Sequence, residues 1–211
     1  MAVEEKRIRV GRSARYFTAG NRRDEVWFVL HGYGQLARTF LIELEPLADG
    51  RLLVAPEALS RFYPNHPTLE VGASWMTRED RESEIADSIE YLDAVYREAG
   101  SAPHVRVLGF SQGGATAARW FARGSSRIDH LILWGCAFPN DVDLEPARER
   151  FARARVHSVI GSHDGFVSEL ELQSQTERFT RAAIDLELVR FEGGHRIDAE
   201  VLRRVTAAPH P

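Results

Sequence analysis

The stretch HVRVLGFSQGGATAARWFARG, residues 104–124, decides how the rest of the chain folds. It begins with alternating apolar residues that predict a buried strand, and it continues into a helix-forming run that ends near Gly124. Between the two lies Gly-Phe-Ser-Gln-Gly, the G-x-S-x-G pattern of a sharp turn that presents a serine where a strand meets a helix. The pattern makes Ser111 a candidate nucleophile.

Composition narrows the class of protein. The length of 211 residues fits one α/β domain over residues 1–211, and the net charge of −4 is mild. Arginines are scattered among carboxylates, which argues against a nucleic-acid surface. The N-terminus shows no signal peptide and no apolar run predicts a membrane span, so we expect a soluble, cytoplasmic protein. The single cysteine, Cys136, is interpreted as a small buried residue, and the sequence leaves homodimer formation open.

Apolar segments of strand length alternate with amphipathic segments of helix length. This order predicts a mainly parallel, doubly wound sheet flanked by helices, with no room for a large cap domain. Two segments are expected to differ from the pattern: residues 6–19 as an edge hairpin of two strands, and residues 56–76 as a long aromatic loop. The strands are predicted at 25–30, 51–55, 104–110, 130–135, 156–161 and 186–191, and the main helices at 36–47, 77–99, 115–122, 169–183 and 196–206.

A catalytic serine needs a base and a group that orients the base, both in loops that follow strands. His195 follows the last predicted strand, and Asp164 follows the strand at 156–161. The order Ser111, Asp164, His195 is the order that this kind of sheet uses. Four other residues are weaker candidates because they fall inside a strand, in the tail, at the wrong strand end or within a helix: His157, His210, Asp185 and Asp198. His163 is interpreted as structural.

Two backbone N–H groups should hold the oxyanion. One is expected from Gln112, the residue after the serine, and the other from Tyr33 in the His31–Gly34 loop, whose glycines allow close approach. His31 is interpreted as a brace for this loop. The histidines show no ligand spacing, so we expect no metal.

Several segments together resemble the phospholipase/carboxylesterase family of α/β-hydrolases, which includes the acyl-protein thioesterases. The resemblance implies an α/β-hydrolase fold, a serine esterase or thioesterase activity, a cytoplasmic location and no cofactor. The family's Val-Pro after the aspartate is replaced here by Gly165-Phe166. The segments that carry the resemblance are Leu30-His31-Gly32-Tyr33-Gly34, Gly109-Phe110-Ser111-Gln112-Gly113-Gly114, Ser74-Trp75-Met76, Gly161-Ser162-His163-Asp164 and Gly193-Gly194-His195.

The sequence therefore favours a carboxylesterase for small-molecule esters with short- to medium-chain acyl groups. A thioesterase or lysophospholipase with the same residues is the alternative within enzymes, and a non-catalytic, hydrolase-like binding protein is the alternative outside them. The resemblance implies an acyl groove near Trp75. We expect Trp75 and Met76 to form one side of this groove, with Tyr33 and Phe166 opposite.

Overall fold

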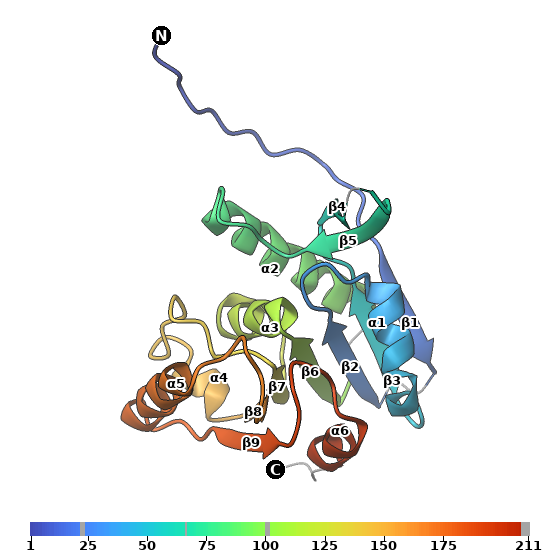
Figure 1. Cartoon of the computed structure of the whole chain (residues 1–211), viewed down its shortest axis with the longest axis vertical. Helices are drawn as coiled ribbons and strands as arrows, with labels where there is room; N and C mark the ends of the chain where they lie inside the picture. The colour runs from blue at the N-terminus through green and yellow to red at the C-terminus, as the bar shows by residue number, and fades with distance from the viewer. Residues whose placement is uncertain (22–23, 66, 100–101, 208–211) are drawn as a thin grey trace.

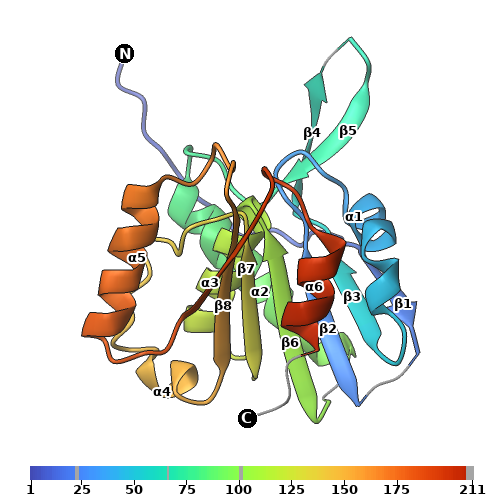
Figure 2. The same ribbon diagram turned by 60° about the horizontal axis from the view of Figure 1, so that its bottom comes forward.

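The computed structural model describes residues 1–21, 24–65, 67–99 and 102–207. Its centre is a seven-stranded sheet with helices on both faces (Figures 1 and 2). The strand order confirms the predicted mainly parallel, doubly wound sheet, because only β1 runs antiparallel to its neighbour β3. In spatial order the strands are β1 (Tyr16–Gly20), β3 (Leu52–Pro56), β2 (Glu25–Leu30), β6 (His104–Phe110), β7 (His130–Trp134), β8 (Arg155–Gly161) and β9 (Glu187–Phe191).

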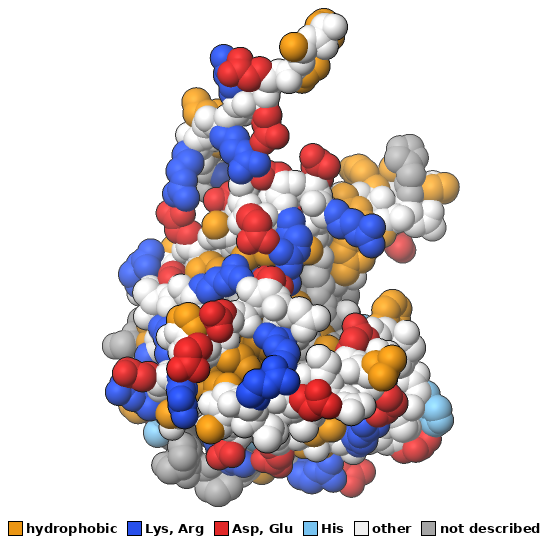
Figure 3. Space-filling model, turned by 90° about the vertical axis from the view of Figure 1, so that its left-hand side faces the viewer, with side chains coloured by type: hydrophobic (Ala, Val, Ile, Leu, Met, Phe, Trp, Pro, Cys, Tyr) orange, Lys and Arg blue, Asp and Glu red, His pale blue; other side chains and the backbone are white. Residues whose placement is uncertain are grey.

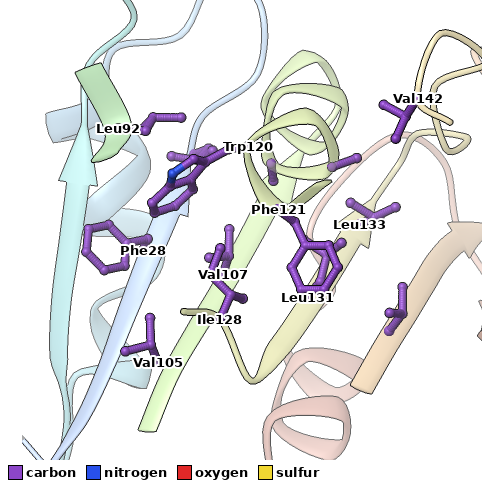
Figure 4. Close-up of a cluster of buried hydrophobic side chains, with 14 of the residues drawn as sticks. Phe28, Leu92, Val105, Val107, Trp120, Phe121, Ile128, Leu131, Leu133 and Val142 are labelled. Atoms are coloured by element: carbon purple, nitrogen blue, oxygen red, sulfur yellow. The ribbon is translucent and has the colours of Figure 1, made fainter. Parts of the chain in front are cut away.

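The sheet divides the hydrophobic core into two layers, one on each of its faces. One cluster of buried side chains joins the sheet to α1, to the short 3₁₀ helix η1 and to α6, and the other joins the opposite face to the remaining helices. Figure 4 shows part of the second cluster, where Phe28 and Val107 from the sheet lie close to Trp120 and Phe121 of α3. The helices are α1 (Ala37–Glu43), η1 (Glu45–Leu47), α2 (Arg81–Ala99), α3 (Gln112–Arg123), α4 (Arg148–Phe151), α5 (Glu169–Arg181) and α6 (Ala199–Thr206).

The apolar run of β2 follows from these two layers. Val26 and Phe28 point into the layer of α2 and α3, whereas Trp27 and Val29 point into the layer of α1 and α6. Side chains alternate across a strand, so a strand covered on both faces is apolar at every position.

The prediction for residues 6–19 is wrong in its first half. Within this segment only β1 is a strand, and its partner is β3 rather than a neighbouring strand of a local hairpin. Pairing with β3 satisfies the backbone N–H and C=O groups on that side of β3 and makes β1 the edge strand of the sheet. Residues 1–15 form no strand and extend from the body of the molecule (Figure 1).

The long loop expected at residues 56–76 contains a two-stranded hairpin that projects from the body (Figure 2). Its strands are β4 (Ser60–Asn65) and β5 (Glu70–Ser74), which pair antiparallel. Pro64 is tolerated in β4 because a strand in a two-stranded hairpin has one edge free of partners. The base is anchored by the buried carboxylate of Glu57, which accepts hydrogen bonds from Arg15 and Arg61, each at 2.7 Å.

Two of the long helices begin later than the sequence predicted. Helix α2 starts at Arg81 rather than residue 77, and α6 starts at Ala199, with Asp198 as its N-cap rather than an interior residue. The prediction for α5 is confirmed, since Ser168 and Glu171 form a capping box at its start.

The surface shown in Figure 3 intersperses basic and acidic side chains, in keeping with the scattered arginines of the sequence. Of the helices in the described ranges, none has the length and hydropathy needed to span a bilayer.

Candidate active site

Ser111 occupies a strained turn between β6 and α3. Its φ of 53° and ψ of −120° lie in a region that side chains rarely adopt. The flanking glycines make the turn possible, because a Cβ at Gly109 would collide with the backbone of Gly113. The Ser111 N–H donates to the carbonyl of Trp134 at 2.7 Å, which fastens the turn to β7. The serine thus stands at the carboxyl edge of the sheet and at the N-terminus of α3, which favours negative charge.

Asp164 and His195 meet at the same edge. The Nδ1 atom of His195 lies 2.8 Å from Oδ2 of Asp164. The aspartate side chain is 1% exposed and the histidine side chain 18% exposed, so the pair is shielded but the imidazole remains accessible. The two loops are held together by backbone bonds, including that from His163 N–H to the carbonyl of Gly193 at 2.8 Å.

The imidazole lies beside the serine turn. Phe110, which directly precedes Ser111, has its ring centroid 4.8 Å from that of His195. Gly135 at the end of β7 lines the same cleft as Ser111, and a Cβ on Gly135 would come within 2.9 Å of Cε1 of His195. The structure therefore places all three sequence-predicted residues at the same edge of the sheet, in the loops after β6, β8 and β9.

The loop after β2 is braced as the sequence suggested. His31 is buried, its Nδ1 lies 2.8 Å from the carbonyl oxygen of Gly32, and its Nε2 accepts from Ala58 N–H at 3.1 Å. Burial lowers the pKa of His31, which keeps the ring in the neutral form that these two bonds require. The N–H of Gly32 donates to Oε1 of Gln35 and the N–H of Gly34 to the carbonyl of Ala73. Both neighbours of Tyr33 are therefore held in place.

The side chain of Gln112 has a role that the sequence did not reveal. Its Oε1 accepts from the N–H of Trp75 at 2.9 Å, and its Nε2 donates to the carbonyl of Met76 at 2.8 Å. These bonds tie the residue after the serine to the segment that follows β5. No spacing rule in the sequence marks this contact, because the two segments are joined only by the fold.

The expected groove residues near β5 must be corrected. Trp75 is only 2% exposed, and its indole N–H donates to the carbonyl of His31 at 2.9 Å, so it is a core residue rather than a wall of an open groove. Met76 is half-buried, and its sulfur accepts from Arg119 at 3.8 Å. Tyr33 is exposed and packs against Phe62, with ring centroids 5.0 Å apart.

A cleft of about 450 Å³ opens at Ser111. We call it the Ser111 cleft. Phe166 borders it, with its ring 4.4 Å from that of His195 and 77% exposed. The rest of the lining comes from the loop after β7 (Gly135, Cys136, Ala137, Phe138, Pro139 and Asn140) and from Val167 with the start of α5 (Leu170, Glu171 and Ser174), together with Gln112. Of these residues, only Gln112 was predicted from the sequence to lie at the site. Burial raises the pKa of the Cys136 thiol to about 12, so this residue stays protonated.

One wall of the Ser111 cleft is fixed by buried charge. Next to it, the carboxylate of Asp141 receives two hydrogen bonds of 2.9 Å from Arg119 and one of 2.9 Å from Arg81. These arginines hold the pKa of the Asp141 carboxyl well below its usual range. Arg178 donates to the carbonyl of Val142 at 2.7 Å, so the loop is held from both sides.

Metal-binding sites in proteins are formed by groups of His, Cys, Asp and Glu side chains. Within the described ranges, no three His, Cys, Asp or Glu residues are grouped so that they could hold a metal ion.

Comparison with known proteins agrees with this architecture. In maize (Zea mays), acyl-protein thioesterase 2 superposes with a TM-score of 0.74 at 17% identity, covering 92% of this chain and 97% of that one. A carboxylesterase from Mesorhizobium loti gives 0.73 at 18% identity, with 93% and 95% covered. A phospholipase/carboxylesterase from Dyadobacter fermentans gives 0.68 at 18% identity, with 93% and 96% covered. At these identities the likeness shows the shared α/β-hydrolase fold.

A search of curated protein sequences finds no match. The profile of a serine hydrolase family, FSH1, matches residues 26–201, from β2 into α6. This range includes the serine turn, both loops that carry Asp164 and His195, and the sheet between them. With most of its length matched and the α/β-hydrolase architecture in place, the chain belongs to the serine hydrolase (FSH1) family.

Proposed function

We propose that this serine hydrolase cleaves carboxylic esters through an acyl-enzyme formed on Ser111. The observation that carries the proposal is the hydrogen-bonded Asp164–His195 pair, with a buried carboxylate, beside a serine in a strained turn. The hydrogen bond to Asp164 fixes the proton of His195 on Nδ1, which leaves Nε2 free to accept the proton of the serine hydroxyl.

The reaction has two halves. Ser111 Oγ attacks the ester carbonyl while its proton moves to His195 Nε2, and the N–H groups of Tyr33 and Gln112 stabilise the negative oxygen. The carbon–oxygen bond then breaks, and His195 gives its proton to the leaving alcohol. Water enters, loses a proton to His195 and attacks the acyl carbon. The bond from that carbon to Ser111 Oγ then breaks, His195 returns the proton to Oγ, and the acid leaves.

The Ser111 cleft supports a preference for short to medium acyl chains. Phe138, Phe166 and Leu170 offer apolar surface near the serine, whereas Asn140 and Ser174 bring polar groups to the same cleft. Each methylene buried against apolar surface favours binding by up to about 0.8 kcal/mol, and a methylene beside polar groups or water gains little. Catalytic efficiency should therefore rise over the first few carbons and then level off.

A fluorophosphonate probe and a series of ester and thioester substrates test the proposal. The parent protein should be labelled once and should hydrolyse esters, and Ser111→Ala should lose labelling and at least about a thousandfold in rate. Ser125→Ala is the matched control, because Ser125 is an exposed serine after the C-terminus of α3, and its hydroxyl donates to Asp93 at 2.8 Å, away from Asp164 and His195. Labelling without turnover would favour a binding protein, and faster cleavage of thioesters would favour a thioesterase.

A further inference from the structure

A second concave surface touches His195. It lies on the face of the sheet that α1 and α6 cover, and Figure 2 shows the position of these two helices. We call it the α1–α6 groove. It has a volume of about 390 Å³, and its lining includes Gln35, Leu47, Phe110, His195, Ala199 and Leu202. We propose that this groove binds the alcohol portion of the ester, while the acyl portion occupies the Ser111 cleft. The inference rests on the proposed ester hydrolysis.

The position of His195 supports this division of the substrate. Its Nδ1 is engaged by Asp164, so Nε2 must hand the proton to the leaving oxygen. That oxygen has to lie within hydrogen-bond reach of the imidazole when the ester bond breaks. The edge of the ring that holds Cε1 and Nδ1 packs against Gly135 in the Ser111 cleft, and the histidine also lines the α1–α6 groove. We therefore expect an alcohol that leaves on the side of His195 to contact the α1–α6 groove.

The start of the groove coincides with the oxyanion loop. Gln35 lines the groove, and the same side chain accepts the hydrogen bond from Gly32 N–H at 2.7 Å. Phe110 lies next to the serine in sequence and also lines the groove. An ester carbonyl held between Tyr33 and Gln112 would thus have the Ser111 cleft on one side and the α1–α6 groove on the other.

The lining indicates an uncharged alcohol with an alkyl or aryl body. Leu47, Phe110 and Leu202 form a buried apolar floor. The charged side chains stand in exposed positions, and two of them already have partners. Arg196 donates to Asp198 at 3.1 Å, and Nε of Arg203 donates to the carbonyl of Ala199 at 3.2 Å.

The test compares ethyl, butyl and hexyl esters of one acid, because these three alcohols have nearly equal acidity and differ only in length. Acid release is measured on the purified full chain by titration at constant pH. For the parent protein, kcat/KM should rise by up to about fourfold for each methylene that enters the groove. A second series varies the acyl chain at constant alcohol.

Three substitutions separate the two subsites. Ala199→Phe places a ring in the groove from an exposed position and should flatten the dependence on alcohol length while keeping the dependence on acyl length. Ser174→Phe in the Ser111 cleft should do the reverse. Glu200→Phe adds the same ring to the next residue of α6, outside the groove lining, and should preserve both dependences. Melting temperatures of all variants establish that each is folded.

The outcomes are distinct. If the parent hydrolyses the esters with no dependence on alcohol length, or if Ser174→Phe rather than Ala199→Phe removes that dependence, the groove is not the alcohol subsite although the proposed function stands. If the folded parent cleaves no ester of either series, the proposed function and this inference both fail.

Discussion

Adding one methyl group at Gly135 should slow the reaction while leaving the fold in place. Gly135 has a φ of 63°, and a Cβ there would lie 2.9 Å from Cε1 and 3.0 Å from Nδ1 of His195. An ordinary contact needs at least 3.4 Å, so the imidazole must retreat by about 0.5 Å (3.4 minus 2.9). Phe110 at 3.3 Å restricts the alternative of moving the methyl group itself.

The magnitude follows from these distances. A misplacement of about 1 Å at a catalytic group costs on the order of a hundredfold in rate, so about 0.5 Å should cost Gly135→Ala on the order of tenfold in kcat. The left-handed backbone conformation should also lower the free energy of unfolding by about 1–2 kcal/mol. Ester hydrolysis normalised to fluorophosphonate-titrated sites measures the first effect, and urea unfolding measures the second.

Gly165→Ala is the matched control. Gly165 lies in the loop directly after Asp164, its φ is outside the left-handed region, and an added Cβ would meet no atom within 4 Å. This variant should keep the parent rate and stability. The reasoning is refuted if Gly135→Ala loses stability yet hydrolyses esters as fast as the parent, because His195 would then not need its observed position.

Three other substitutions, at Asp164, Trp75 and His157, test separate parts of the argument, and Asp185→Asn serves as a control for the first. Asp164→Asn should lower kcat by about a thousandfold or more, because the correct imidazole tautomer is lost. Asp185→Asn should change kcat little. Equal losses of kcat in the two variants would show that Asp164 is not the residue that orients His195. Trp75→Ala should lower the free energy of unfolding by about 3–5 kcal/mol in urea titrations. It should change kcat/KM by the same factor for all acyl chain lengths. A loss of kcat/KM for one chain length alone would indicate that Trp75 contacts the acyl chain. Burial lowers the pKa of His157, so the unfolded chain binds the proton more readily and stability should fall below about pH 6.5. His157→Gln should make that decline shallower, and an unchanged slope in urea midpoints against pH would contradict this.

The parts of the fold that were predictable carry local signals. The apolar run of β2 required cover on both faces, and the glycines around Ser111 required a tight turn between strand and helix. The capping box at Ser168 marked the start of α5. Each signal lies within a few residues of the feature that it specifies, so no knowledge of tertiary contacts was needed.

The incorrect predictions concern features that only tertiary contacts determine. Trp75 looked like a surface aromatic in a loop, but its burial depends on His31 and Gln112, both more than thirty residues away in sequence. The hairpin of β4 and β5 has a bulge near Pro64 and lacks a regular alternation of apolar residues. Phe138 reaches the Ser111 cleft from a loop whose shape is set by arginines on other elements.

The position of β9 in the sheet has a consequence for how the protein loses activity. In the described sheet β9 is an edge strand that pairs only with β8, and most of its side chains are incompletely buried. The turn that carries His195 directly follows this edge strand, whereas Ser111 directly follows β6, which lies near the centre of the sheet. Edge segments open by local unfolding at a lower free energy than the centre of a sheet. Mild heat or denaturant would therefore detach the base from the nucleophile while Trp27 of β2 and Trp120 of α3 stayed packed, whereas Trp134, which contacts Phe191 of β9, would be disturbed. The β9 amides would exchange with solvent before those of β6.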